Sequence, residues 1–429
     1  MPLFGTDGIR AVGYDLILSK LPLKLGWAIG SLSPKTVTVA RDTRLSSPEI
    51  EEQLTRGLIS HGVDVICLGV VPTPLLAYYT KLVGARFGIM ITASHNPPEY
   101  NGIKMLNSAG EKISHAMETK IERLTARATY GKIRVGTVCR VTDAEERYLN
   151  YLSTAHDADF KGISVRLDCC FGAAFKVAEE AFRRFGAMVT ADCSSPNGSL
   201  VNVFSGSTNI DFLAGRMRRS DFIGFSFDGD GDRVLAVKDG AVFSGDHFLY
   251  YISDFLKKQE KLRNNTVVGT VLSNSGLERS LSAGGITFLR SDVGDKYVLE
   301  LMKHSGAALG GEKSGHILTD GFVLTGDGIR GAILLLDALK HSTLPPYIPI
   351  PQKEINIKVK DKSAVINDNR LTETTAFLSK SFVSGGKLLV RESGTEPLIR
   401  IMGEGNEQEV DCFLSILKNL IKEINDNLK

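Results

Sequence analysis

The chain has 429 residues, more than one ordinary hydrophobic core accommodates, so its length predicts several domains. Hydrophobic residues at 43% and charged residues at 23% are typical of a globular protein, and a net charge of +2 argues against a broad nucleic-acid-binding face. With no signal-peptide core, no apolar stretch near the ~20 residues of a membrane span and six cysteines without CxxC or zinc spacing, we expect a cytoplasmic protein with reduced thiols and neither nucleic-acid nor membrane partners.

A β-α-β unit opens the predicted fold. The β-branched run 36–39 predicts a short strand, and Ser47 is the expected N-cap of a helix with Pro48 at its first position. The helix has a buried stripe at four-residue spacing, formed by Ile50, Leu54 and Leu58. Gly62 ends the helix and residues 63–68 form the next strand, which predicts a sheet with parallel pairs.

The same alternation continues along the chain. Strands are predicted at residues 163–167, 222–227 and 266–272, with a short apolar lead at 307–309, and helices at 173–185 and from Ser275. Three times a strand runs into a polar loop rich in glycine or proline: at GIMITASHNP, at IGFSFDGDGDR and at AALGGEKSGH. Three α/β domains, each with one such loop, would explain this repetition.

The C-terminal part begins after a proline-rich stretch. LPPYIPIPQ contains four of the 14 prolines and predicts an extended linker. Beyond it, strands at 387–390 and 399–402 and a helix from Glu407 predict a small α+β domain. We therefore place the domains at residues 1–150, 151–248, 249–344 and 352–429.

Ser94 sits in the loop Thr-Ala-Ser-His-Asn-Pro-Pro after an apolar run. Pro97 and Pro98 lack N–H donors, so neither a helix nor a ladder continues there. One interpretation is a stiff surface turn without chemistry, and the other is a rigid support for a reactive hydroxyl.

Asp228, Asp230 and Asp232 alternate with glycines in DGDGDR. Carboxylates at every second position can surround one hard cation, and oxygen-only ligands favour Mg²⁺. A solvated acidic turn is the simpler alternative. An EF-hand is excluded, because its glycine and glutamate positions hold Arg233 and Asp239 and a strand precedes the loop.

Two further polar loops are weaker signals. In RESGTEP, small residues leave backbone N–H groups free to form an anion nest, and Arg391 and Arg400 could grip a phosphate, although an ordinary hairpin loop remains open. In GEKSGH, a carboxylate and a hydroxyl could meet sugar hydroxyls. No GxxxxGK[ST] and no strand-to-helix GxGxxG occurs, so P-loop and dinucleotide folds have no support.

Taken together, these loops resemble the α-D-phosphohexomutase superfamily, and within it most closely the phosphoglucosamine mutase family. The resemblance runs through FGTDGIR, ARDTRLSS, GVVPTPLLAYYT, ITASHNPPEYNGIK, DGDGDR, VGDKYVLELM, GEKSGH, TGDGI and RESGTEPLIRIM. It implies an α/β fold class with four domains around a central cleft: three similar mixed-sheet α/β domains and a smaller C-terminal α+β domain.

The resemblance also implies a mutase that interconverts glucosamine 6-phosphate and glucosamine 1-phosphate, feeding UDP-N-acetylglucosamine and cell-wall precursors. Ser94 would be the phosphoserine, coordinated with one Mg²⁺ per chain on Asp228, Asp230 and Asp232, and a sugar bisphosphate would be intermediate and activator. Candidate catalytic residues are Ser94, Lys104, His95, His316 and Arg10. Candidate substrate-binding residues are Arg233, Glu312, Ser314, Arg391, Ser393, Gly394, Thr395 and Arg400.

The sequence departs from the family pattern at several places. Ala40 replaces a glycine, Glu392 replaces a proline, and SGSTN and DCCFG stand for CGSTH and DCANG. The serine and metal loops are intact, so the departures bear on sugar preference. A phosphoglucomutase or phosphomannomutase is the alternative, and a non-catalytic sugar-phosphate-binding protein is disfavoured because Ser94 and all three aspartates are present. The expected partner is a small hexose phosphate, and a homodimer is the candidate assembly.

Overall fold

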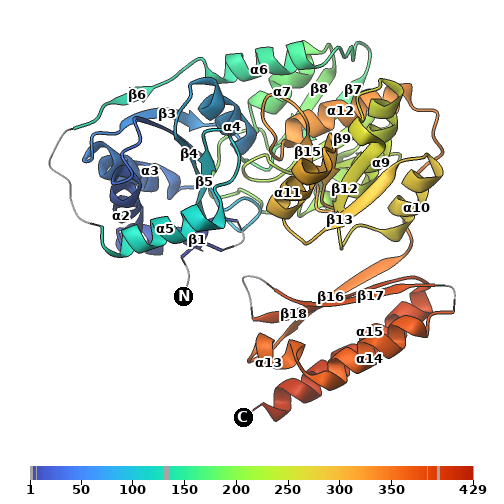
Figure 1. Cartoon of the computed structure of the whole chain (residues 1–429). Helices are drawn as coiled ribbons and strands as arrows, with labels where there is room; N and C mark the ends of the chain where they lie inside the picture. Colours follow the sequence, from blue (N-terminus) through green and yellow to red (C-terminus); the bar gives the residue numbers. More distant parts are fainter. Residues whose placement is uncertain (1–2, 6, 129–134, 384, 394–396, 429) are drawn as a thin grey trace. The chain divides into compact units, whose positions relative to one another are not determined.

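The computed structural model describes residues 3–5, 7–128, 135–383, 385–393 and 397–428. Two compact units make up the chain (Figure 1): the first comprises 1–273 and 281–345, and the second 274–280 and 346–429. Over the described residues, three mixed sheets belong to the first unit and one antiparallel sheet to the second.

The first sheet has the order β1-β5-β4-β2-β3-β6. Its strands are β1 (Ile9–Val12), β5 (Tyr100–Asn107), β4 (Phe87–Ile91), β2 (Thr36–Arg41), β3 (Asp64–Val70) and β6 (Val138–Arg140). The accompanying helices are α1 (Gly13–Leu18), α2 (Leu21–Gly30), α3 (Ser47–Ile59), α4 (Thr73–Leu82) and α5 (His115–Ala126). Because β2 pairs in parallel with β3 across α3, the predicted β-α-β unit is confirmed.

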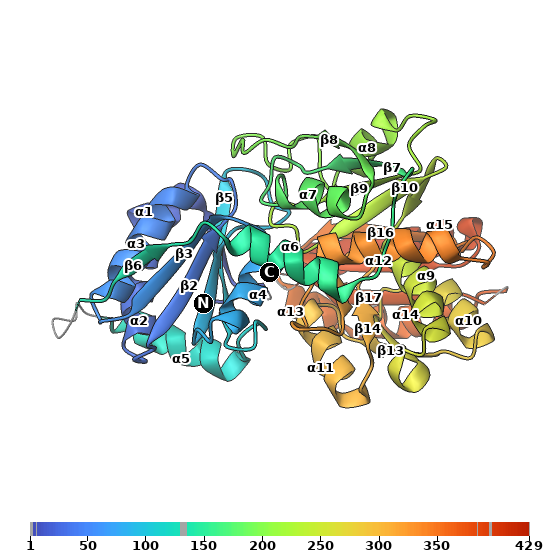
Figure 2. The same ribbon diagram turned by 90° about the horizontal axis from the view of Figure 1, so that it is seen from above.

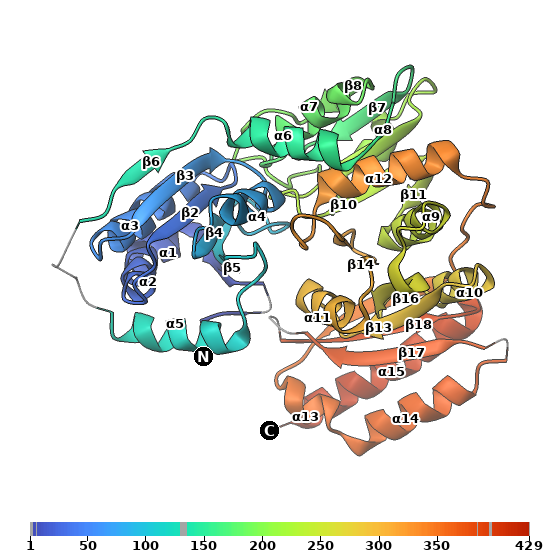
Figure 3. The same ribbon diagram turned by 45° about the horizontal axis from the view of Figure 1, so that its top comes forward.

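Helices α2, α3 and α5 share one hydrophobic core with the first sheet, whereas α4 packs on β2 and β4 (Figure 3). The predicted stripe of α3 is confirmed, since its three members are fully buried. The predicted N-cap is wrong: Ser47 is the first helical residue, and its hydroxyl donates to Asp42 Oδ1 at 3.0 Å instead of capping the helix.

The second sheet has the order β11-β10-β9-β7-β8. Its strands are β11 (Ala241–Phe243), β10 (Val234–Lys238), β9 (Ile223–Phe227), β7 (Ser164–Asp168) and β8 (Met188–Asp192), and its helices are α7 (Val177–Arg184) and α8 (Ile210–Arg216). The helix predicted at 173–185 begins four residues later, because Ala173 N–H donates to Gly229 O at 2.8 Å and so belongs to a turn beside the aspartate loop.

The third sheet has the order β13-β12-β14-β15. Its strands are β13 (Thr287–Ser291), β12 (Thr266–Thr270), β14 (Leu309–Gly311) and β15 (Ile317–Thr319). The helices are α9 (Gly245–Lys258), the 3-10 helix η1 (Arg263–Asn265), α10 (Ser275–Ala283), α11 (Asp295–Ser305) and α12 (Gly328–His341). The apolar lead noted at 307–309 runs into β14, which begins at Leu309. Helix α12 packs on both α9 and β10, and so ties the third sheet to the second.

Helix α6 (Ala144–Ala155) passes between α4 and α7 (Figure 2). Its Tyr148 and Tyr151 pack on Tyr78 of α4, with ring centroids 5.8 and 5.0 Å apart. Tyr148 also donates to Asp327 Oδ2 at 2.6 Å, at the start of α12. One helix thereby joins all three sheets of the first unit.

In the second unit, β16 (Gln352–Lys358), β18 (Leu398–Glu404) and β17 (Lys387–Glu392) form the sheet, accompanied by α13 (Lys362–Ile366), α14 (Asn369–Lys380) and α15 (Glu407–Asn427). Asn406 caps α15 by accepting from the N–H groups of Gln408 and Glu409. The buried stripe of α15 covers the sheet with Val410, Leu414, Leu417, Ile421 and Ile424. The predicted fold class is confirmed: mixed α/β sheets in several domains and a small C-terminal α+β domain.

Among the described residues, no helix is both long and apolar enough to cross a bilayer. The six cysteines, all of them described, are free thiols. Cys169 and Cys170 are buried, and burial raises the pKa of each thiol well above its usual value. These thiols therefore stay protonated and act as small apolar groups in the core.

Candidate functional site

Three polar loops leave equivalent strands of the three sheets in the first unit. They follow β4, β9 and β14, and each of these strands has a parallel neighbour on one side and the next strand of the chain, antiparallel, on the other. Arg233 and His316 form a bridge between the second and third loops, and Ser94 contacts Asp228 between the first and second. The loops predicted from the sequence are therefore neighbours.

Ser94 is fully buried at the junction of the first two loops. Its Oγ donates to Asp228 Oδ2 at 2.6 Å, and Nδ1 of His95 lies 3.4 Å from the same Oγ. Burial, together with Arg233 and Arg10, lowers the pKa of His95 to about 3, so its ring is uncharged at neutral pH. The Ser94 hydroxyl is therefore held against a carboxylate and shielded from bulk water.

Asp228, Asp230 and Asp232 are buried, and one oxygen from each lies within 4.8 Å of the others. Burial and the two neighbouring carboxylates raise the pKa of Asp228 well above its usual range. Oδ1 of Asp230 and Oδ1 of Asp232 have no hydrogen-bond partner among the described residues. Buried carboxylate oxygens without partners are costly unless something binds them, and a set of oxygen ligands fits a hard divalent cation such as Mg²⁺.

Lys104, on β5, neutralises part of this negative charge. Its Nζ lies 2.9 Å from Asp230 Oδ2, 2.9 Å from Asp232 Oδ2 and 3.1 Å from Asp7 Oδ2. Burial alone would favour the neutral amine, but these carboxylates raise the pKa of Lys104 well above its usual value. The three N–H bonds of the ammonium group therefore each face a carboxylate.

Arg10 reaches the serine loop, where a backbone carbonyl and the side-chain amide of Asn96 hold its guanidinium. Its Nη1 donates to Ala93 O and to Asn96 Oδ1, both at 2.7 Å, and its Nη2 pairs with Asp7. Arg10 therefore contacts the serine loop on both sides of Ser94, at Ala93 and Asn96.

The third loop holds Glu312 and His316 in fixed orientations. Glu312 is buried, and its Oε1 accepts a hydrogen bond from Gly294 N at 3.0 Å. Nε2 of buried His316 lies 3.5 Å from Asp295 Oδ2, and there is room for the imidazole only because residue 326 is glycine. Ser314 is exposed. A carboxylate and an imidazole from one loop thus lie next to the aspartate loop.

Arg233 immediately follows the aspartates. Burial opposes its charge, but Asp232, Asp228 and Glu312 raise the pKa of the guanidinium above its usual value. In the part of the chain that the structure describes, its Nε has no hydrogen-bond partner. A permanent cation with a spare donor suits an anionic or hydroxyl-rich ligand.

In the second unit, Arg391 on β17 and Arg400 on β18 are direct neighbours in the antiparallel register. Each guanidinium lies 3.9 Å from Glu354 Oε1 on β16, so one carboxylate is shared by two arginines. Ser393 is buried, and its carbonyl accepts from Lys362 Nζ at 2.6 Å. Gly394 and Thr395 lie outside the described residues. The paired guanidiniums form a place where an anion would be stabilised.

Several residues of the site were missed in the sequence. Asp7 and Asp295 lie in the quoted motifs FGTDGIR and VGDKY, whose acidic residues could have been singled out. Lys112 joins them by pairing with both. Thr73, from VPTPLL, donates to Asp230 Oδ2 at 2.6 Å, and no local pattern points to this contact.

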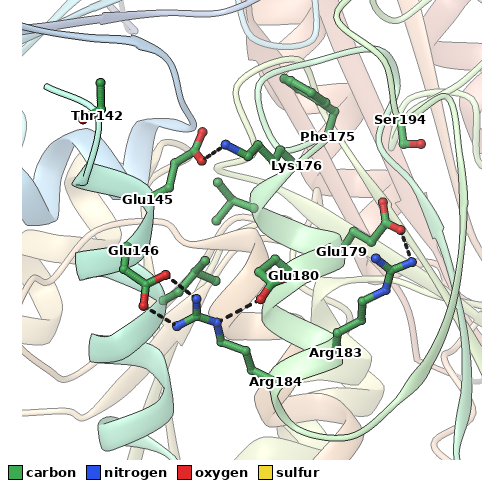
Figure 4. A pocket seen from close by; sticks show the side chains of 12 residues that line it. Thr142, Glu145, Glu146, Phe175, Lys176, Glu179, Glu180, Arg183, Arg184 and Ser194 are labelled. Carbon is green, nitrogen blue, oxygen red and sulfur yellow. Dashed lines mark hydrogen bonds and ion pairs between the residues drawn. The ribbon is translucent and has the colours of Figure 1, made fainter. Parts of the chain in front are cut away.

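A separate cavity of about 520 Å³ lies between α6 and α7 (Figure 4). The charged side chains lining it pair with one another: Glu145 with Lys176, Glu146 and Glu180 with Arg184, and Glu179 with Arg183. The described residues that line this cavity belong to α6, α7 and the segments beside them, and not to the three loops. Because its charges satisfy one another, it has no group that singles out a ligand.

Three models of the phosphoglucomutase/phosphomannomutase family match the chain: alpha/beta/alpha domain I at residues 1–132, alpha/beta/alpha domain III at 244–348 and the C-terminal domain at 354–411. A solved phosphoglucomutase/phosphomannomutase family protein from Burkholderia thailandensis has a TM-score of 0.80 at 23% identity, covering 100% of this chain and 98% of that one. For the Aspergillus fumigatus N-acetylphosphoglucosamine mutase in complex with GlcNAc-6P and magnesium, the TM-score is 0.70 at 16% identity, with 99% and 96% covered. These structures show that the fold is shared.

Some relatives are more similar in sequence than these solved structures. The phosphoglucosamine mutase of Finegoldia magna is 40% identical, and the alignment covers 98% of both chains. That of Alkaliphilus oremlandii is 38% identical over 98% of this chain and 99% of the relative. With such identity over nearly its whole length, the chain belongs to the phosphoglucosamine mutase family of phosphohexomutases.

Proposed function

We propose that this hexosamine phosphate mutase interconverts glucosamine 6-phosphate and glucosamine 1-phosphate, with Ser94 as the phosphoryl carrier. The observation that carries the proposal is the contact of 2.6 Å between buried Ser94 Oγ and Asp228. Asp228 belongs to a cluster of three carboxylates that could hold a metal ion. The names of relatives 38–40% identical support the amino sugar.

In the proposed reaction, phosphorylated Ser94 transfers its phosphoryl group to the free hydroxyl of the sugar phosphate. The bond between phosphorus and Ser94 Oγ breaks, a bond between phosphorus and the sugar oxygen forms, the sugar hydroxyl gives up its proton, and Ser94 Oγ takes up a proton to become a hydroxyl again. The resulting bisphosphate reorients in the site, and the phosphoryl group at its other end is transferred back to Ser94. The form of the enzyme in which the Ser94 hydroxyl donates to Asp228 then corresponds to the stage between the two transfers.

The cation, when bound, would draw negative charge from the transferring phosphoryl oxygens, and Asp228, Asp230, Asp232 and Ser94 are the residues that would hold it. The fit rests on the two carboxylate oxygens without partners and on an all-oxygen donor set. The Aspergillus fumigatus enzyme, of the same fold, was solved with magnesium, which supports Mg²⁺ as the ion.

The other charged groups have distinct tasks in this proposal. Lys104, whose three N–H bonds face carboxylates, contributes positive charge beside the transferring group. His316, with Asp295 behind it, is the candidate acceptor of the sugar hydroxyl proton. His95, whose low pKa makes it a weak base, lies next to Ser94 Oγ as an uncharged ring. Arg10 holds the serine loop in place.

The substrate-binding groups form two sets, one for the sugar ring and one for the distant phosphate. Arg233, Glu312 and Ser314 would contact the ring hydroxyls in either orientation. Arg391, Ser393 and Arg400, with Gly394 and Thr395, would hold the phosphate that is not reacting, because paired guanidiniums match a phosphate dianion. Glu354, which lies against both arginines, would give way to that phosphate.

Some features of the working enzyme are proposals without a structural counterpart. We expect activation by a trace of sugar bisphosphate, a cytoplasmic location and a homodimer. Size-exclusion chromatography with light scattering measures the assembly directly. A monomeric mass at micromolar concentration would remove the dimer from the proposal and leave the reaction untouched.

The test of the function is a parallel assay on glucosamine 6-phosphate, glucose 1-phosphate and mannose 1-phosphate, with a trace of the matching bisphosphate. We expect the highest kcat/KM on the glucosamine substrate, loss of nearly all turnover in Ser94→Ala, and a phosphate adduct on the wild-type peptide containing Ser94. Ser19→Ala is a matched control, since this hydroxyl donates to Leu16 O, three residues earlier in the chain. A preference for glucose or mannose phosphate would favour the alternative mutase, and an active Ser94→Ala would refute the phosphoserine.

A further inference from the structure

The backbone of Ser94 has an unusual conformation. Its φ of 50° lies in the left-handed region, which a serine adopts only when its surroundings impose it. One restraint is local: Ser94 N–H donates to Thr92 Oγ1 at 2.8 Å, and Thr92 Oγ1 donates to Asp42 Oδ2 at 2.7 Å. The carbonyl side of Ser94 needs restraints of its own.

Arg44 supplies the first of these from within the first sheet. It is fully buried, and its Nε donates to Asp42. Nη2 donates to the carbonyl oxygens of Ser94 at 2.9 Å and Asn96 at 2.8 Å, and Nη1 donates to those of Pro97 and Tyr100. All five N–H bonds of the guanidinium are thus used to shape the serine loop.

Asn202 supplies the second from a different sheet. It lies in the segment between β8 and α8, and its Nδ2 donates to Ser94 O at 2.7 Å and to Asn96 O at 3.0 Å. These are the same two carbonyl oxygens that Arg44 holds. Gly229 makes this approach possible, because a Cβ there would lie 2.5 Å from Ser94 O and 3.2 Å from Asn202 Nδ2.

We propose that Asn202 is a positioning residue for Ser94: by holding the carbonyls on both sides of His95, it keeps the serine hydroxyl directed at Asp228. The proposal rests on the proposed function of Ser94 as phosphoryl carrier. It also explains how the sheet that carries the aspartates sets the geometry of a nucleophile belonging to another sheet. Neither the serine loop nor the aspartate loop contains the residue that aligns them.

The test compares Asn202→Ala with Asn197→Ala, a control in the same segment whose side-chain Oδ1 accepts hydrogen bonds from Ser199 N and Oγ. Glucosamine 1,6-bisphosphate is mixed with each dephosphorylated enzyme, and the rate of Ser94 phosphorylation is followed by mass spectrometry. We expect a ten- to hundredfold slower rate and lower kcat in Asn202→Ala, with KM for the sugar phosphate close to wild type, because a small misplacement of a reacting group costs about this much. The variant should still unfold in one cooperative transition, at a lower midpoint, because it loses two hydrogen bonds and places alanine at a φ of 59°. Asn197→Ala should match wild type.

Asn202→Asp separates the donor from the shape of the side chain. It replaces the N–H bonds by a carboxylate oxygen facing two carbonyls, so it should be at least as slow as Asn202→Ala; wild-type rates in both variants would overturn the proposal. If wild-type enzyme is itself never phosphorylated, the proposed function fails. The crystal structure of Asn202→Ala then decides: Ser94 Oγ displaced from Asp228 supports positioning by Asn202, and an unchanged contact refutes it.

Discussion

Lys112 and Asp295 form an ion pair of 2.6 Å that joins the region following β5 to the start of α11. Lys112 also pairs with Asp7, and Asp295 in turn faces His316. Burial opposes the charge of Lys112, but Asp295 and Asp7 raise its pKa above the usual value. One lysine therefore connects the acidic residue beside Lys104 to the imidazole of the third loop.

Lys112→Met should lower stability, because it leaves two carboxylates without their shared cation. For fully buried pairs the loss is about 3–5 kcal/mol, and since the side chains here are 21% and 14% exposed we expect about 1–3 kcal/mol. Lys303→Met is the control: Lys303 pairs with Glu111 at 2.7 Å across the same two sheets but is 49% exposed. Thermal unfolding should show a clearly larger drop in midpoint for Lys112→Met than for Lys303→Met. Equal drops would contradict a stabilising role for the Lys112 ion pairs.

Asp230→Asn should weaken binding of Mg²⁺ and lower kcat, since one anionic ligand becomes neutral while its size is kept. Titration calorimetry with Mg²⁺ alone measures the first effect without turnover, and EDTA should abolish the activity of the wild type. Asp239→Asn is the control, because Asp239 is 83% exposed and its φ of 51° suits asparagine. Full activity of the chelated enzyme would show that the three aspartates form only an acidic turn.

Arg391→Ala should raise KM for the sugar phosphate roughly ten- to a hundredfold, the equivalent of one charge-assisted contact of about 1.5–3 kcal/mol. The Mg²⁺ activation constant should stay the same, because the aspartates belong to the other unit. Arg391→Lys should rescue little if the contact is a guanidinium fork. Arg370→Ala, which removes an arginine paired with Asp368 and Glu423, should change neither constant. An unchanged KM in Arg391→Ala would remove this loop from the substrate site.

His156 makes stability depend on pH. Burial and the neighbouring Arg330 lower its pKa from 6.5 to about 3, and Arg330 Nε donates to His156 Nε2 at 3.1 Å. Below pH 6.5 the unfolded chain binds a proton that the folded chain does not, so the stability present above this pH is lost as the pH falls towards 3.

We expect a loss of up to ~1.4 kcal/mol per pH unit from this one group. Unfolding midpoints between pH 7 and 5 should therefore fall less steeply in His156→Gln, which keeps an acceptor for Arg330. His115→Gln, at a side chain that is 86% exposed, should leave the slope of the wild type. Parallel slopes for His156→Gln and wild type would refute the role of His156.

The repeating plan of the fold could be predicted because it is local. Ile50, Leu54 and Leu58 carry their helical period in the sequence, and all three are fully buried. Boundaries were less predictable where a tertiary contact competes with a local signal. Ser47 looks like a cap but is used by Asp42, and Ala173 looks helical but is held by Gly229.

The site divides in the same way. Ser94 and the three aspartates could be singled out as candidates from residue type and spacing, and the role proposed for Ser94 came from the family resemblance. Lys104 could be named only through the family resemblance. Its carboxylate partners are distant in the sequence, because Asp7 comes from the first motif and Asp230 lies 126 residues after Lys104. Thr73 and Asn202 could not be found, because their roles exist only after separate sheets have come together.

Helix α10 begins in one compact unit and ends in the other. Its first N–H group, that of Ser275, donates to both carboxylate oxygens of Glu404 at 3.1 Å, and Asn274 Nδ2 donates to Ile350 O at 2.9 Å. The C-terminal unit is therefore not a removable module: a chain truncated at Pro345 would lose the groups that satisfy the start of a helix upstream. Gene fusions and domain deletions in this protein would have to respect residues 274–280 as well as the proline-rich connection.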